Sequence, residues 1–468
     1  MANRLSALDA SLLYLEDATT PMHIGGVAVF RRPRSGFDYE RLVELIERRL
    51  ALVPRYRQKI ATVPGHLARP VWTDDVNFDI THHVRLSALP RPGTAEQLGE
   101  LVARLMSRPL DHSRPLWELY LVEGLARNRF ALVTKTHHAM IDGIGAIEIG
   151  QVILDVTANP ADDPERLWMP EPEPSQVRLV TDAVSEVVRR PGELVENVRA
   201  AVEDVASLAR KVFGVVSGVT DLLSSAVRPA PSGPLNVRVS RARRFAVAKA
   251  QLADLKKVRA THGGTVNDVV LAVVAGALRS WLLSRGEVVT SQTTIRAMAP
   301  LSVRDEETTN TPAGMVGSKV TANLIDLPVG EPSPVVRLQH VSHAMRAHAD
   351  SGQSVAADAL VRLGGFAPPT LHALGARAAS SFSQRIFNIL VTNVPGPQVS
   401  LYAAGAKMLE IYPVVPLARN QAVSIGVTSY DGGVYFGLNA DRDALPDVDN
   451  LGRMVEESVE ELLATVAP

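Results

Sequence analysis

Apolar stretches alternate along the chain with polar, charged and proline-rich stretches, and their spacing predicts both strands and helices. Residues 23–33 (HIGGVAVFRRP), 118–125 (ELYLVEGL) and 129–138 (RFALVTKTHH) are short, rich in apolar and β-branched residues, and typical of strands. The segment 38–54 (DYERLVELIERRLALVP) has apolar residues three or four apart, which predicts an amphipathic helix that ends at Pro54. Residues 145–156 (GAIEIGQVILDV) also have helical spacing.

The second half of the chain repeats this mixture. Residues 265–284 (TVNDVVLAVVAGALRSWLLS) predict a helix that is apolar on all sides and therefore buried. Residues 387–397 (FNILVTNVPGP) predict a strand, and residues 422–440 (AVSIGVTSYDGGVYFGLNA) predict two strands joined by a Gly-Gly turn.

Two interruptions divide the chain into α/β lobes. Prolines cluster between residues 160 and 174, and the segment RPAPSGPLNV closes a helical stretch near residue 237. We therefore predict an N-terminal lobe (residues 1–158), a proline-rich crossing with a helical connecting segment (159–237), and a C-terminal lobe (238–468). The connecting helix mixes acidic and basic residues on its polar face, so packing against the lobes is favoured over lying on a membrane.

Composition narrows the function classes. The 49 Lys and Arg residues nearly balance the 50 Asp and Glu residues, which argues against nucleic acid as the main partner. The chain has no cysteine, so disulfides and thiolate metal sites are excluded. The charged N-terminus does not resemble a signal peptide, and the apolar run 269–278 is too short for a membrane span. We expect a cytoplasmic protein that can associate peripherally with a membrane or a lipid droplet.

The sequence HHAMIDG at residues 137–143 is the strongest candidate for chemistry. A histidine at the end of a strand is held rigidly, and its pKa near 6.5 lets a neutral imidazole accept a proton from an attacking hydroxyl. His138 is the predicted base, with His137 and Asp142 as structural supports, and Gly143 permits a turn into the following helix. An adjacent histidine pair alone is more typical of a structural feature, but the Asp-Gly at this spacing favours a site.

HHAMIDG matches the HHxxxDG signature of the CoA-dependent acyltransferases that include chloramphenicol acetyltransferase and condensation domains. More narrowly, the chain resembles the bacterial wax ester synthase/acyl-CoA:diacylglycerol acyltransferase family, of the mycobacterial triacylglycerol synthase type. The resemblance covers nearly the whole chain and includes LSALDASLLYLED, PMHIGGVAVF, SRPLWELYLVEGL, TVNDVVLAVVAGALRSWL, VTNVPGP and YFGLNADRDALPDVD.

The resemblance implies two chloramphenicol-acetyltransferase-like lobes of mixed sheets and flanking helices, with a channel between them. It implies transfer of a long-chain acyl group from acyl-CoA to diacylglycerol or a long-chain alcohol, with no metal or redox cofactor because the thioester is already activated. The family's PLW and ND motifs, together with an asparagine in VTNVPGP, give further candidates for the channel: Pro115, Leu116, Trp117, Asn267, Asp268 and Asn393.

Each of these further candidates also has a structural interpretation. Leu116 and Trp117 are typical core residues. Asn267 and Asp268 follow Thr265, a candidate helix cap, so capping explains them as well as substrate contact does. Asn393 precedes a rigid Pro-Gly-Pro loop that is equally consistent with a plain turn.

Other functions fit the sequence less well. His137 and Asp142 also satisfy the H-x-x-x-x-D pattern of glycerophosphate acyltransferases, but no F-P-E-G-type phosphate motif follows. A hydrolase would need a G-x-S-x-G nucleophile turn and a dehydrogenase a G-x-G-x-x-G after a strand, and neither is present. The alternative from a different class is a lipid-binding or lipid-droplet protein with a vestigial acyltransferase site.

Overall fold

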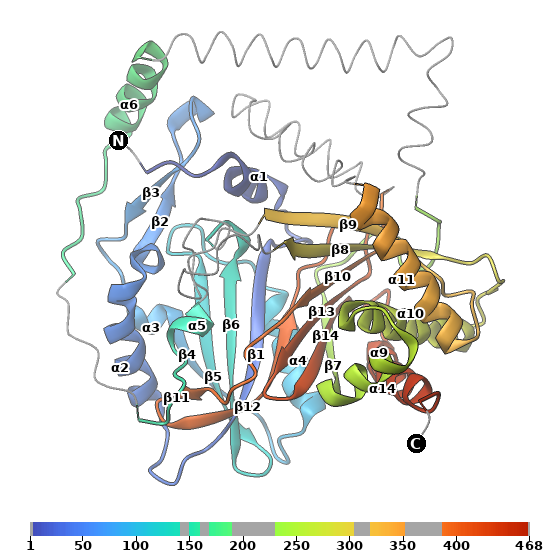
Figure 1. Cartoon of the computed structure of the whole chain (residues 1–468). Helices are drawn as coiled ribbons and strands as arrows, with labels where there is room; N and C mark the ends of the chain where they lie inside the picture. Colours follow the sequence, from blue (N-terminus) through green and yellow to red (C-terminus); the bar gives the residue numbers. More distant parts are fainter. Residues whose placement is uncertain are drawn as a thin grey trace, which may run out of the picture.

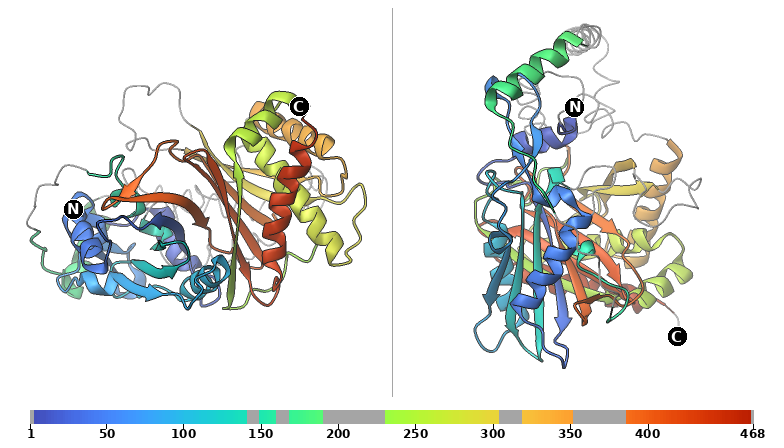
Figure 2. Two further views of the ribbon diagram at one scale, coloured as in Figure 1. Left: turned by 90° about the horizontal axis from the view of Figure 1, so that it is seen from below. Right: turned by 90° about the vertical axis from the view of Figure 1, so that its left-hand side faces the viewer.

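The computed structural model describes residues 3–140, 149–159, 168–189, 230–303, 319–351 and 386–466. Two six-stranded mixed sheets form the framework, and they stand side by side with a short hairpin and helices around them (Figures 1 and 2). The hairpin pairs β2 (Gln58–Ala61) with β3 (Val71–Asp74).

The first sheet has the order β11-β12-β1-β6-β5-β4. Its strands are β11 (Tyr402–Ala403), β12 (Ala406–Val414), β1 (His23–Arg31), β6 (Arg129–His137), β5 (Trp117–Leu125) and β4 (Val84–Ala88). β1, β6 and β5 confirm the three strands predicted from the N-terminal pattern. β11 and β12 come from the C-terminal part of the sequence, and β12 pairs antiparallel with β1, so a late segment completes the early sheet.

The second sheet has the order β7-β14-β13-β10-β8-β9. Its strands are β7 (Arg243–Gln251), β14 (Gly433–Asp441), β13 (Val423–Tyr430), β10 (Ile389–Val394), β8 (Ile295–Val303) and β9 (Lys319–Leu327). The turn between β13 and β14 is not Gly-Gly as predicted, because Tyr430 pairs with Gly433 and leaves Asp431 and Gly432 as the loop. Both loop residues have positive φ, as a two-residue Asp-Gly hairpin requires.

Helices cover the sheets and connect them. They are α1 (Ala7–Leu15), α2 (Tyr39–Arg49), α3 (Ile80–His83), α4 (Ala95–Met106), α5 (Ile149–Val152), α6 (Gln176–Arg189), α9 (Leu252–His262), α10 (Val266–Ser284), α11 (Pro334–Ser351) and α14 (Val448–Leu463). Within the described residues there are also short 3-10 helices: η1 (Leu50–Leu52), η2 (Pro54–Arg57), η3 (Pro64–His66) and η4 (His138–Met140). α2 confirms the predicted amphipathic helix, although it ends at Arg49 and continues as η1 and η2.

α10 is the buried helix that the sequence predicts. It packs against α14 and α11, which lie with α9 on one side of the second sheet (Figures 1 and 2). Among the described residues it is the one helix long and apolar enough to cross a membrane, but 72% of its apolar window is buried inside the protein. Packing in the core therefore accounts for its composition. Most of the predicted connecting helix after α6 lies outside the described residues.

α4 joins the two sheets. It begins with a capping box in which Thr94 and Gln97 satisfy each other's backbone N–H groups. Gly99 lets the helix approach β7, because a β-carbon there would lie 2.6 Å from the carbonyl oxygen of Phe245. Buried apolar side chains form one cluster around the first sheet and another around the second, and Phe245 of β7 belongs to the first cluster.

Candidate active site

The histidine pair lies where β6 ends. His137 is the last residue of the strand, between β1 and β5, and its N–H donates to the carbonyl oxygen of Leu116 at 2.9 Å. His138 begins the 3-10 turn η4, and its N–H donates to the carbonyl oxygen of Met22 at 2.8 Å. These two backbone hydrogen bonds thus fix the main-chain positions of His137 and His138, from which the imidazole side chains project.

The ring of His137 is fully buried, and its contacts define its tautomer. Its Nδ1 accepts a hydrogen bond from the N–H of Ala139 at 3.1 Å, so the proton of the neutral ring is on Nε2. Nε2 lies 3.6 Å from Oε2 of Glu16, a polar contact somewhat longer than a hydrogen bond. Burial lowers the pKa of His137 and outweighs the opposing effect of Glu16, which keeps this ring neutral.

Glu16 is held by a second histidine. It is the C-terminal cap residue of α1, and its Oε2 accepts a hydrogen bond from Nε2 of His112 at 2.7 Å. Burial raises the pKa of the Glu16 carboxyl, but the contacts with His112 and His137 outweigh burial and hold that pKa below its usual value. The hydrogen bond to Glu16 raises the pKa of His112 above its usual value, because the negative carboxylate stabilises the protonated ring.

His138 differs from His137 in its surroundings. As a residue it is partly exposed rather than fully buried, although its Nδ1 is buried, and it belongs to the turn rather than to the strand. The two rings therefore do not occupy equivalent positions. The role of His138 as a base stays a prediction, and Asp142 and Gly143 lie outside the described residues.

The predicted PLW motif supports the strand end from the core. Pro115, Leu116 and Trp117 are buried, and the indole Nε1 of Trp117 donates to the carbonyl oxygen of Tyr56 at 2.7 Å. His83 stacks on the indole with ring centroids 4.6 Å apart. Since the carbonyl of Leu116 holds the N–H of His137, the motif acts on the histidine pair through the backbone.

The ND motif divides into two roles. Asp268 is buried and closes a capping box at the start of α10, where it accepts from the N–H of Thr265 at 2.8 Å. Asn267 instead accepts a hydrogen bond from Nδ2 of Asn393 at 2.9 Å. The structure thus brings the two predicted asparagines together, in the second lobe, and explains Asp268 by helix capping.

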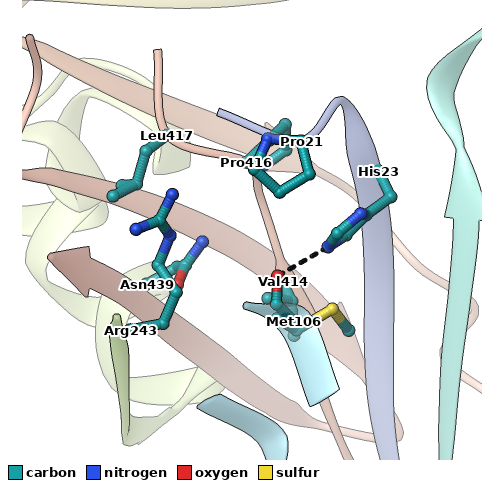
Figure 3. A pocket seen from close by; sticks show the side chains of 8 residues that line it. All are labelled: Pro21, His23, Met106, Arg243, Val414, Pro416, Leu417 and Asn439. Atoms are coloured by element: carbon teal, nitrogen blue, oxygen red, sulfur yellow. Dashed lines mark hydrogen bonds between the residues drawn. The ribbon is translucent and has the colours of Figure 1, made fainter. Parts of the chain in front are cut away.

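Two cavities lie at the junction of the sheets. The smaller encloses about 10 Å³, close to what one buried water needs, and its lining includes His23, Arg243 and Asn439 (Figure 3). His23 pairs across the sheet with His137, and Arg243 donates to the carbonyl of Thr19, so this space adjoins the site and joins both lobes. The larger cavity encloses about 300 Å³ near the start of α4.

His138 is not among the residues that line these two cavities. The channel that the sequence predicts around this ring therefore stays a prediction. Within the described ranges no group of His, Asp or Glu side chains could hold a metal ion.

Family models match both halves of the chain. Residues 5–270 match the wax ester synthase/diacylglycerol acyltransferase catalytic domain, and residues 316–463 match the WS/DGAT C-terminal domain. The chain belongs to the wax ester synthase/diacylglycerol acyltransferase family.

Individual members of the WS/DGAT family are similar along most or all of their length. The protein of Mycobacterium tuberculosis H37Rv named probable diacylglycerol O-acyltransferase tgs3 is 51% identical over 263 residues, which are 56% of this chain and 97% of that protein. The protein of the same strain named probable diacylglycerol O-acyltransferase tgs1 is 33% identical and covers 99% of this chain and 96% of its own length.

Solved structures confirm the predicted two-lobe fold. The wax ester synthase/diacylglycerol acyltransferase from Marinobacter aquaeolei VT8 superposes with a TM-score of 0.70 at 27% identity, covering 99% of this chain and all of that one. The first condensation domain of the calcium-dependent antibiotic synthetase has a TM-score of 0.58 at 14% identity, covers 100% of this chain and 98% of its own, and shows the shared fold.

Glu16 and His112 of this WS/DGAT member were not among the candidates predicted from the sequence. Glu16 lies in the stretch LSALDASLLYLED, and His112 lies just before the PLW motif. Their separation of 96 residues hides the contact from any local pattern. In the sequence, Glu16 was marked only as an acidic residue directly after a helix, within a stretch that resembles the family.

Proposed function

We propose that this chain is an acyl-CoA-dependent O-acyltransferase that forms triacylglycerol from diacylglycerol, and wax esters from long-chain alcohols, with His138 as general base. Membership in the WS/DGAT family supports the reaction class, and the names of the mycobacterial relatives support diacylglycerol as the acceptor. The single observation that carries the role of His138 is the unequal histidine pair: His137 is buried with its Nδ1 occupied, whereas His138 leaves the strand and is partly exposed.

The proposed chemistry needs one proton acceptor. The imidazole of His138 takes the proton of the acceptor hydroxyl as the oxygen attacks the thioester carbonyl. The tetrahedral intermediate then collapses, the C–S bond breaks, and the thiolate of CoA receives the proton from His138. The thioester supplies the activation, so acyl-CoA is a co-substrate and we propose no metal or redox cofactor.

The acceptors also suggest where the protein works. Diacylglycerol and long-chain alcohols partition into lipid phases, so we propose a cytoplasmic enzyme that acts at a membrane or lipid-droplet surface. The balanced charge gives little electrostatic attraction to anionic lipid, which favours transient contact over permanent attachment.

Release of CoA from palmitoyl-CoA tests this proposal. The wild-type protein and the variant His138→Ala are compared with diacylglycerol or hexadecanol as acceptor, and labelled ester is quantified. Loss of a general base should lower kcat by about 10²- to 10⁴-fold. His262→Ala is the matched control, because His262 bonds Thr465 in the second lobe and should leave kcat unchanged.

The outcome that defeats the proposal is equally concrete. If the wild-type protein released no more CoA than His138→Ala with either acceptor, the enzyme proposal would fail. Binding of diacylglycerol without turnover would then favour the lipid-binding alternative.

A further inference from the structure

The carboxylate of Glu16 faces the ring of His137 and contacts the backbone N–H of Met22, the residue whose carbonyl accepts the N–H of His138. We propose that Glu16, braced by His112, is a positioning residue that sets the orientation of His137 and the location of His138. This inference rests on the proposed function, because positioning matters only if His138 performs the chemistry. Glu16 acts through the two histidines and is not assigned a contact with substrate.

Glu16 is linked to the backbone of His138 through Met22. Oε1 of Glu16 accepts the N–H of Met22 at 3.4 Å, and the carbonyl of Met22 accepts the N–H of His138 at 2.8 Å. A single residue thus separates the carboxylate from the proposed base. Since Met22 directly precedes β1, a shift of the carboxylate would displace the start of that strand and the turn that carries His138.

Glu16 also faces the ring of His137. Its Nδ1 already accepts the N–H of Ala139, which leaves Nε2–H as the group that can face a partner. Oε2 of Glu16 lies 3.6 Å away and provides a negative acceptor in that direction. Hydrogen bonds of catalytic sites are often long without substrate and shorten when it binds. The carboxylate therefore favours the Nε2–H tautomer of His137 and one orientation of its ring. Because His138 is the next residue, fixing His137 also limits where the His138 backbone can lie.

His112 is a hydrogen-bonding partner of the buried Glu16 carboxylate. The Glu16 side chain is only 9% exposed, and a buried charge is costly without a partner. His112 supplies that partner at 2.7 Å while its own ring is 49% exposed. His112 also lies three residues before Pro115, so it connects the end of α1 to the segment whose Leu116 carbonyl holds His137. Three contacts from separate parts of the chain converge on one carboxylate.

Kinetics of Glu16 variants test this positioning role. We expect Glu16→Ala to lower kcat by about 10²-fold while the KM for acyl-CoA changes less than about twofold, because a misplacement near 1 Å costs that much. Glu16→Gln should lose less, since it keeps an oxygen that can face Nε2–H. The control Glu123→Gln removes a carboxylate that pairs with Arg32 at 2.6 Å near the other end of β5, and it should leave kcat unchanged.

A double variant tests whether His112 acts through Glu16. If His112 acts only through Glu16, the double variant Glu16→Ala/His112→Ala should have the same kcat as Glu16→Ala alone. His112→Ala by itself should still lower kcat. Multiplicative losses would show that His112 acts on its own and would overturn its bracing role.

Amide exchange gives a readout that does not depend on activity. In Glu16→Ala, and more weakly in Glu16→Gln, the amides of residues 137–140 should exchange on the order of tenfold faster than in the wild type or the Glu123→Gln control. If Glu16→Ala does not fold, the nearly isosteric Glu16→Gln carries both measurements.

The results separate the two proposals. Wild-type kcat and wild-type exchange in both Glu16 variants would overturn the positioning role, and a rise in KM with unchanged kcat would place Glu16 in substrate binding instead. A wild-type protein that releases no more CoA than His138→Ala would overturn the proposed function, and the exchange measurement would still decide whether Glu16 orders the histidine pair.

Discussion

Replacing Trp117 by phenylalanine tests whether the PLW motif supports the site or contacts the substrate. The indole is fully buried, and its Nε1–H bonds the carbonyl of Tyr56 at 2.7 Å. Phenylalanine leaves roughly 40 Å³ of space, which costs about 1 kcal/mol at roughly 24 cal/mol per Å³. The buried carbonyl that loses its donor adds about 1–3 kcal/mol. The free energy of unfolding of the first lobe should therefore fall by about 2–4 kcal/mol.

Thermal unfolding followed by circular dichroism measures this loss. For a lobe of roughly 150–250 residues, each 1 kcal/mol lowers the midpoint by about 2–4 °C, so we expect a drop of about 4–16 °C. At 20 °C, where the variant is folded, kcat should stay within about threefold of the wild type, because the substitution leaves the Leu116 carbonyl and its bond to His137 in place.

Trp281→Phe is the matched control for this experiment. Trp281 is equally buried, in the second lobe, and its Nε1 donates to Asp447 at 3.1 Å. Both variants should lose stability and keep kcat. A Trp117→Phe protein with a wild-type midpoint but a kcat reduced tenfold or more would refute the structural role and place the indole against the substrate.

Three further predictions follow from contacts elsewhere in the molecule. The lowered pKa of Glu16 contributes stability above pH 4.5, its unfolded value, and the raised pKa of His112 contributes stability that is complete below pH 6.5 and is lost as pH rises. The difference in thermal midpoint between the wild type and Glu16→Gln should therefore be largest from about pH 4.5 to 6.5. A difference that grows up to pH 9 would contradict this. Alanine variants of Asn267 and Asn393 should show a coupling of about 0.5–1.5 kcal/mol in denaturant unfolding, and strict additivity would argue that their hydrogen bond contributes nothing. Gly99→Val should lower the thermal midpoint by forcing α4 away from β7, at a cost of about 1–3 kcal/mol, and an unchanged midpoint would show that the helix shifts freely.

The sequence predicted elements whose signal is local. β6 and α10 follow from continuous apolar runs with clear ends, and α10 even shows its capping box in the letters TVND. The crossing of β12 into the first sheet could not be predicted, because a strand's own pattern does not specify which sheet edge it joins. The Asp431-Gly432 turn was missed by one residue, since three adjacent turn-forming residues allow more than one register.

The candidate site was predictable to the same extent. The pair His137-His138 and the motif at Trp117 are contiguous in sequence, so the resemblance locates them directly. The contact of Asn267 with Asn393 and that of Glu16 with His112 join residues 126 and 96 positions apart, and only the fold brings them together. The candidate residues that are contiguous in sequence are therefore predictable, whereas the residues that contact them from distant parts of the chain are not.

In the proposed mechanism the two adjacent histidines have different roles, a fixed ring and a base. A base must keep a lone pair accessible to the acceptor hydroxyl, and a ring fixed on both nitrogens has none to offer. Nδ1 of His137 accepts the N–H of Ala139, and Nε2–H faces Glu16. The ring is therefore fixed, but it has no free lone pair with which to accept a proton. His138 follows after one peptide bond and takes its position from that anchor and from Met22. If this division holds, replacing His137 by asparagine, which keeps one donor and one acceptor, should preserve more of kcat than replacement by phenylalanine. Equal losses in the two variants would mean that the polar contacts of His137 do not position His138.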